Sequence, residues 1–185
     1  MTPDAGPAGP GAGTPPPGAL ARAVLDGARS RGWTLAAAES LTGGLVVATL
    51  VDVPGASAVV RGGVVAYATD LKATTLGVAP DLLALRGPVD PDVAGQMATG
   101  VRRALGADVG LATTGVAGPD PQDGHPPGEA YVAVSTPAGD RVRRLDLAGT
   151  RAEVRAAVVV AVLTLALEAC GETASDGDGR PVGGL

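Results

Sequence analysis

Hydrophobic residues are distributed along the chain in two patterns, helical spacing in some segments and short continuous runs in others. Helical spacing predicts helices at residues 19–31, 45–51, 69–75, 81–85, 91–105 and 151–170. Short apolar runs predict strands at residues 33–38, 59–68, 108–114, 130–135 and 141–147. Because helices and strands alternate along most of the chain, the pattern predicts a layered α/β fold.

Capping and turn residues support several of these boundaries. Asp90 followed by Pro91 is typical of a helix N-cap and a first helical turn. Thr69 or Asp70 is the candidate N-cap of the short helix that begins there. Residues 137–140, Pro-Ala-Gly-Asp, predict a turn that joins the last two strands in a hairpin.

The two ends of the chain differ in composition from its middle. Residues 1–18 are rich in Pro, Gly and Ala, which predicts a disordered tail. Residues 171–185 are rich in Gly, Asp and Ser, which predicts a second, flexible tail. The stretch between them, residues 19–170, is long enough for one domain with its own core.

Composition and charge exclude several classes of function. The net charge is −5, which leaves no broad basic surface for nucleic acid or for an anionic membrane. Residues 1–18 lack the basic and apolar regions of a signal peptide, and the longest mostly apolar run, residues 156–167, is short for a bilayer span. The single cysteine, Cys170, excludes an intramolecular disulfide. We therefore expect a cytoplasmic protein without a nucleic-acid or membrane partner.

The chain contains a single lysine, Lys72, although it contains many arginines. It also lacks Asn, Ile and Phe, which have AT-rich codons, so the composition indicates a GC-rich gene. Arginine stays charged, whereas a desolvated lysine can lose its proton and act as a base. A chemical role that arginine cannot fill would explain why Lys72 remains; chance retention is the alternative.

Two polar segments follow predicted strands and precede predicted helices. Glu39–Gly44 reads Glu-Ser-Leu-Thr-Gly-Gly and matches neither a P-loop, a dinucleotide fingerprint nor a nucleophile elbow. Such a junction can bind an anion through free N–H groups, or it can be an ordinary N-cap. Tyr67 and Lys72 bracket the second junction, where they could face one pocket or lie at the surface.

A third segment, Thr113–Pro119, carries a strand of small residues into glycines. It is either another ligand-binding edge or a plain turn. His125 is the only histidine and lies in a Pro- and Gly-rich loop, which argues against a Ser-His-Asp triad. The chain also has too few histidines and cysteines for a zinc site. The candidate base for a serine is then Lys72.

Four motifs in this order resemble those of the CinA carboxy-terminal domain family, the nicotinamide-nucleotide amidohydrolases. They are Ala-Glu-Ser-x-Thr-Gly-Gly at residues 38–44, the Tyr67 and Lys72 pair, Thr-Gly-x-Ala-Gly-Pro at residues 114–119, and Gly-x-Arg-x-x-Val-Arg at residues 149–155. The resemblance covers residues 19–169, and the four ordered motifs together are specific.

The resemblance implies a three-layer α/β/α sandwich with a mixed, mostly parallel sheet. It implies hydrolysis of nicotinamide mononucleotide to nicotinate mononucleotide and ammonia, without a metal or another cofactor. Ser40 would be the nucleophile, Lys72 its base, and Tyr67 a group that hydrogen-bonds or relays the proton. Arg151 would bind the phosphate. The remaining residues expected to bind the substrate or its oxyanion are Glu39, Thr42, Gly43, Gly44, Thr114, Gly115, Ala117 and Gly118.

The chain departs from the family pattern at four positions, Leu41, Thr69, Asp90 and Glu129. These departures bear on the choice of substrate more than on the fold. Two other functions stay open: a catalytically weak nucleotide- or partner-binding module connected with competence or DNA damage, and a Ser-Lys amidase for another amide. We also expect a homo-oligomer, either a dimer or a trimer.

Overall fold

The computed structural model describes residues 15–171. The tails predicted at residues 1–18 and 171–185 therefore lie almost entirely outside the described residues. Where the ranges overlap, Pro17 begins the first helix and Gly171 ends the last one. The first helix thus starts two residues before the expected Ala19, because a proline in the first turn gives up no helical hydrogen bond.

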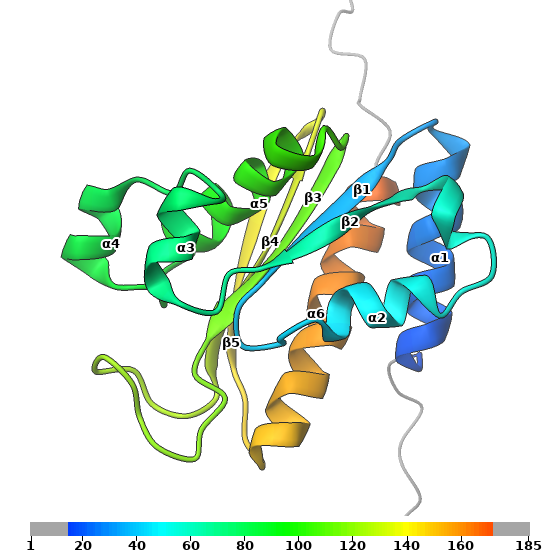
Figure 1. Cartoon of the computed structure of the whole chain (residues 1–185). Coiled ribbons are helices and arrows are strands. Elements are labelled where there is room, and N and C mark those ends of the chain that lie inside the picture. Colours follow the sequence, from blue (N-terminus) through cyan, green and yellow to red (C-terminus); the bar gives the residue numbers. More distant parts are fainter. Residues whose placement is uncertain (1–14, 172–185) are drawn as a thin grey trace, which may run out of the picture.

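A five-stranded sheet forms the middle layer of the fold, with the strand order β2-β1-β3-β4-β5 (Figure 1). The strand β1 is parallel to both β2 and β3, whereas β4 is antiparallel to β3 and to β5. Only β4 runs against the other four strands, so the predicted α/β fold with a mixed sheet is confirmed. The strands are β1 (Leu35–Glu39), β2 (Val60–Val65), β3 (Val109–Gly115), β4 (Glu129–Thr136) and β5 (Gly139–Asp146).

Helices cover both faces of the sheet, which gives three layers (Figure 1). One face is covered by α1 (Pro17–Ser30), α2 (Leu45–Val51) and α6 (Arg151–Gly171), and the other by α3 (Thr69–Thr74), α4 (Pro80–Arg86) and α5 (Pro91–Leu105). A single 3₁₀ turn, η1 (Ala56–Ala58), precedes β2.

The strand β1, which lies between β2 and β3, is buried on both faces. Leu35 and Ala37 pack into the core beneath α1, α2 and α6, whereas Ala36 and Ala38 pack into the core beneath α5. A strand covered on both sides has no solvent-facing positions, which explains the continuous apolar run that predicted it. The first polar groups along this strand come at its carboxyl end, Glu39 and then Ser40.

The predicted caps had different outcomes. Asp90 caps α5 as expected, since its Oδ1 accepts hydrogen bonds from the backbone N–H groups of Asp92 at 2.8 Å and Val93 at 3.4 Å. The N-cap predicted at Thr69 or Asp70 is wrong: the cap position of α3 is Ala68, with no side-chain hydrogen bond. Thr69 lies instead in the first turn of α3.

The apolar run at residues 156–167, which was expected to be short for a bilayer span, belongs to a longer helix, α6. Its 21 residues are long enough to cross a membrane by length and composition, with a mean hydropathy of 1.9 in the most apolar window. Half of that window is buried inside the fold, where α6 packs against α1 and β4. A core helix passes the same test, so this is weak evidence for a span, and the absence of a membrane partner stays a prediction.

Candidate active site

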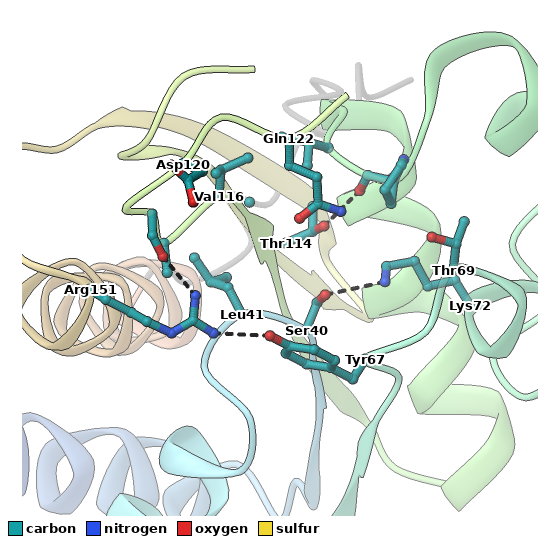
Figure 2. Close-up of a pocket in the computed structure, with 15 residues that line it drawn as sticks. Ser40, Leu41, Tyr67, Thr69, Lys72, Thr114, Val116, Asp120, Gln122 and Arg151 are labelled. Atoms are coloured by element: carbon teal, nitrogen blue, oxygen red, sulfur yellow. Dashed lines mark hydrogen bonds between the residues drawn. The ribbon is translucent and has the colours of Figure 1, made fainter. Parts of the chain in front are cut away.

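A pocket lies where β1, β2 and β3 end, at one edge of the sheet (Figure 2). Parallel strands place their carboxyl ends together, so segments far apart in sequence meet here. We call it the edge pocket. Its lining residues are Ser40, Leu41, Tyr67, Thr69, Lys72, Pro88, Val89, Thr114, Gly115, Val116, Ala117, Gly118, Asp120, Gln122 and Arg151.

Ser40 is the first residue after β1 and faces the edge pocket (Figure 2). Its backbone N–H donates to the carbonyl of Thr113 at 3.0 Å, which continues the pairing of β1 with β3 by one residue. The side chain is nearly buried, at 9% exposure. Its Oγ accepts a hydrogen bond from Lys72 Nζ at 3.2 Å. The structure therefore pairs the predicted nucleophile with the predicted base.

Lys72 lies on α3 and is almost completely buried, at 1% exposure. Its ammonium group donates to Ser40 Oγ and, at 2.9 Å, to the carbonyl of Ala66. Burial lowers the pKa of Lys72 from 10.5 to about 8, against an opposing attraction from Asp70. Desolvation acts in this direction because the charged form loses its water.

Glu39 does not line the edge pocket, which corrects the expectation that it contacts the substrate. Its side chain is fully buried and points back into the fold. The carboxylate accepts hydrogen bonds from the backbone N–H groups of Gly44 at 2.9 Å, Val46 at 3.1 Å and Val47 at 2.9 Å. Glu39 therefore caps α2 and holds the loop that carries Ser40.

Thr42, Gly43 and Gly44 also lie outside the pocket lining, contrary to expectation. The N–H of Gly43 donates to the Ser40 carbonyl at 3.1 Å, and the N–H of Gly44 is bound by Glu39. Thr42 Oγ1 lies 2.8 Å from Thr113 Oγ1. The two glycines adopt positive φ angles of 59° and 100°, so they shape the turn instead of presenting N–H groups to a ligand.

Other backbone N–H groups remain open for an oxyanion. Within residues 15–171, no hydrogen bond occupies the N–H of Leu41, Ala117 or Gly118. All three residues line the edge pocket. The predicted third segment is thus part of the site. Thr114 belongs to it through its place in the lining, although its hydroxyl donates to the carbonyl of Pro88 at 2.6 Å.

Tyr67 and Arg151 also line the pocket, and the Tyr67 hydroxyl and the Arg151 guanidinium point toward each other (Figure 2). One Arg151 nitrogen donates to the Tyr67 hydroxyl at 2.9 Å, and another donates to the carbonyl of Gly118 at 2.9 Å. Tyr67 is 60% exposed. Within residues 15–171 its hydroxyl makes no hydrogen bond with Ser40 or Lys72 and is held by Arg151, so the predicted relay of the serine proton stays a prediction.

The sequence did not identify every residue of the pocket. Asp120 and Gln122 enter from the polar loop after β3, and Pro88 and Val89 enter from the segment before α5. None of them lies in a helix or strand, so no periodic pattern in the sequence predicts which way their side chains point. In the sequence, Arg155 is indicated only as the last residue of the motif at residues 149–155. It donates to the carbonyls of Leu41 at 2.9 Å and Thr42 at 2.7 Å and so fixes the turn after Ser40.

Glu39→Gln should lower the free energy of unfolding by about 1–3 kcal/mol, because a glutamine NH2 group would face backbone donors in place of an acceptor. Chemical denaturation measures this loss. Asp52→Asn removes the same charge from an exposed position just after α2 and should change stability by less than about 0.5 kcal/mol. Equal effects of the two variants would contradict the capping role of Glu39.

Fold and site together define a three-layer α/β protein with a buried Ser-Lys pair at the carboxyl edge of its parallel strands. The sequence model of the CinA C-terminal domain matches residues 18–170. The chain therefore belongs to the CinA C-terminal domain family, as the motifs predicted.

Curated relatives and solved structures agree with this assignment. A CinA-like protein of Frankia casuarinae is 48% identical over 156 residues, which are 82% of this chain and 36% of that protein. A CinA-like protein of Geobacter sulfurreducens is 45% identical over 136 residues, 73% of this chain and 33% of that protein. The chain thus spans about a third of the length of these relatives.

Among solved structures, the competence/damage inducible protein CihA from Agrobacterium tumefaciens has a TM-score of 0.80 at 33% identity. The match covers 84% of this chain and 96% of CihA. The competence damage-inducible protein A from Klebsiella pneumoniae has a TM-score of 0.80 at 30% identity, over 83% of this chain and 96% of that one.

Proposed function

We propose that this chain hydrolyses the carboxamide of nicotinamide mononucleotide to nicotinate mononucleotide and ammonia. The observation that carries the proposal is the contact of 3.2 Å between the buried Lys72 Nζ and Ser40 Oγ. A lysine with a pKa of about 8 is neutral in an appreciable fraction of molecules near neutral pH, and a neutral amine can accept the proton of a serine.

In the first half of the reaction, Ser40 Oγ attacks the carboxamide carbon while neutral Lys72 takes the hydroxyl proton. The carbonyl oxygen becomes negatively charged, and the open N–H groups of Leu41, Ala117 and Gly118 are the donors available to stabilise it. Lys72 then gives its proton to the nitrogen that leaves as ammonia, which produces an acyl ester on Ser40.

In the second half, water attacks the acyl ester. Lys72 takes one proton from the water and returns it to Ser40 Oγ as the ester bond breaks, which regenerates both residues. The products are the carboxylic acid and ammonia, which exchange a proton in solution to become carboxylate and ammonium, so one water molecule is consumed in each cycle. No step in this scheme requires a metal or another cofactor.

The opposite end of the edge pocket suits the 5′-phosphate. Arg151 is the first residue of α6, where its charge adds to the positive end of the helix dipole. Its guanidinium is already oriented by Tyr67 and Gly118. A planar, positively charged guanidinium held in this way favours binding of a phosphate over binding of a neutral group. Substrate lying between Ser40 and Arg151 would place its sugar in the middle of the pocket.

Arg151→Ala should raise KM for nicotinamide mononucleotide at least about tenfold more than KM for nicotinamide riboside, because only the former carries a phosphate. Steady-state ammonia release with both substrates measures the ratio. Arg103→Ala removes an exposed arginine on α5, away from the pocket, and serves as the control. An equal rise in KM for both substrates would rule out phosphate binding by Arg151.

Ammonia release by the purified protein tests the proposed function directly. The comparison includes the mononucleotide, the riboside, free nicotinamide and unrelated primary amides. Preference for the mononucleotide supports the proposal, whereas preference for another amide would support a Ser-Lys amidase of different specificity. The solved relatives are named for competence and damage, so a partner-binding role in those responses is the second candidate. A partner-binding role would survive loss of the Ser40 hydroxyl.

The remaining expectations about setting and assembly also belong to this proposal. They are a cytoplasmic location, a small-molecule nucleotide as the binding partner, no nucleic-acid or membrane partner, and a homo-oligomer. Size-exclusion chromatography with light scattering would decide between a monomer, a dimer and a trimer.

A further inference from the structure

The loop between β3 and β4 supplies part of the edge-pocket wall. It leaves β3 after Gly115 and returns at Glu129, and two of its polar side chains, Asp120 and Gln122, line the pocket (Figure 2). Both are exposed hydrogen-bonding groups. Exposed loop side chains bind a ligand well only if the loop itself is held in place. The contacts that hold this loop therefore matter for binding.

A tight turn within the loop places Gln122. The N–H of Gln122 donates to the carbonyl of His125 at 3.1 Å, and the N–H of His125 donates back to the carbonyl of Gln122 at 2.9 Å. Gln122 and His125 are thereby fixed to each other. Whatever anchors the His125 side chain also sets the position of Gln122.

The His125 side chain is anchored to the sheet through Glu129. His125 Nδ1 lies 3.1 Å from Glu129 Oε2. Glu129 is the first residue of β4 and is only 7% exposed. Its other oxygen accepts a hydrogen bond from the Tyr131 hydroxyl at 2.9 Å and lies 3.7 Å from an Arg144 nitrogen. The only histidine of the chain thus connects the pocket loop to a buried carboxylate.

The surroundings of Glu129 favour its ionised form. Burial alone would raise the pKa of Glu129, but the hydrogen bonds from His125 and Tyr131 outweigh burial and hold the pKa below its ordinary value. A buried carboxylate needs such donors, because an unpaired one is costly. This requirement gives Glu129 a strong preference for keeping the contact with His125.

We infer that His125 and Glu129 are positioning residues that hold the turn at residues 122–125, so that Gln122 and Asp120 bind the sugar hydroxyl groups of the substrate. The inference rests on the proposed function, since it assumes a sugar between Ser40 and Arg151. Carboxylate and amide oxygens accept hydrogen bonds from hydroxyl groups, and an amide also donates one. Within residues 15–171 the hydrogen bonds of the Ser40 and Lys72 side chains do not involve Asp120 or Gln122, so the contact between His125 and Glu129 should act on binding more than on chemistry.

Kinetics of His125→Ala and Glu129→Gln test the inference. Each should raise KM for the mononucleotide about tenfold and leave kcat within about threefold. Tyr131→Phe is the matched control. It removes a different hydrogen bond from the same carboxylate, lowers stability, and should leave KM within about twofold. A purely structural role for His125 would lower the melting temperature without separating KM from kcat.

Two further measurements link the effect to the loop. In an Asp120→Ala/Gln122→Ala background, His125→Ala should raise KM by no more than about twofold, since the groups it positions are gone. Amide hydrogen exchange of residues 120–128 should become faster in His125→Ala than in Tyr131→Phe. A loosened loop with an unchanged KM would overturn the inference, and so would a raised KM without loosening.

The exchange measurement also separates this inference from the proposed function. If the unmodified protein releases no ammonia from any amide and binds no mononucleotide by calorimetry, the proposed function fails, and sugar binding by Gln122 and Asp120 fails with it. Unchanged exchange in His125→Ala would instead refute the anchoring role while leaving the proposed hydrolysis intact.

Discussion

Ser40→Ala should yield a folded protein whose rate of mononucleotide hydrolysis is lower by about four orders of magnitude or more, because the covalent route needs the hydroxyl. Folding should survive, since Lys72 is the only hydrogen-bond partner of the Ser40 hydroxyl among the residues that the structure describes. The measurement is kcat for ammonia release, together with mononucleotide affinity by calorimetry. Affinity should stay within about tenfold, because Arg151 and the loop groups remain.

Ser57→Ala is the matched control for this variant. Ser57 lies in η1, is exposed and takes no part in the edge pocket, so its loss should leave kcat unchanged. If Ser40→Ala retained activity within about tenfold of the unmodified protein, Ser40 could not be the nucleophile. A water molecule activated by Lys72 would then be the alternative attacking group.

Lys72→Arg and Lys72→Met should both abolish most of the activity, with losses in kcat of about three orders of magnitude or more. Arginine keeps the positive charge but cannot give up its proton, and methionine keeps the apolar stem without a base. The methionine variant guards against misfolding, since a buried arginine could disrupt the site. Activity retained in Lys72→Arg would show that position 72 supplies charge and not a base.

The pH dependence of the unmodified protein follows from the same residue. The base is active only when neutral, so kcat/KM should rise with pH and level off above the pKa of Lys72, which burial lowers to about 8. The rising limb should lie below pH 8, and the logarithm of kcat/KM should rise there with a slope near one. The midpoint reports the pKa of Lys72 in the protein without bound substrate. A midpoint near the 10.5 of an unperturbed lysine would mean that burial does not tune Lys72.

The sequence indicated Ser40 and Lys72 as candidate site residues by two different signals. Ser40 lies one residue beyond a buried strand, and that position alone fixes it at a sheet edge. Lys72 was marked by composition, because a single lysine in an arginine-rich chain is unusual. Glu39 shows the limit of this reasoning. As the last residue of β1 its position was predictable, but its side chain faces the opposite way from that of Ser40 and caps α2.

By itself the sequence determined the alternation of helices and strands, the cap at Asp90 and the family motifs, because each depends on residues close together in the chain. Only the tertiary structure decided which side chains meet. Tyr67 bonds Arg151, which is 84 residues away, and His125 reaches a buried Glu129 on β4. The physical reason is that a side chain takes its partner from the neighbours that packing brings to it, and local sequence does not contain those neighbours.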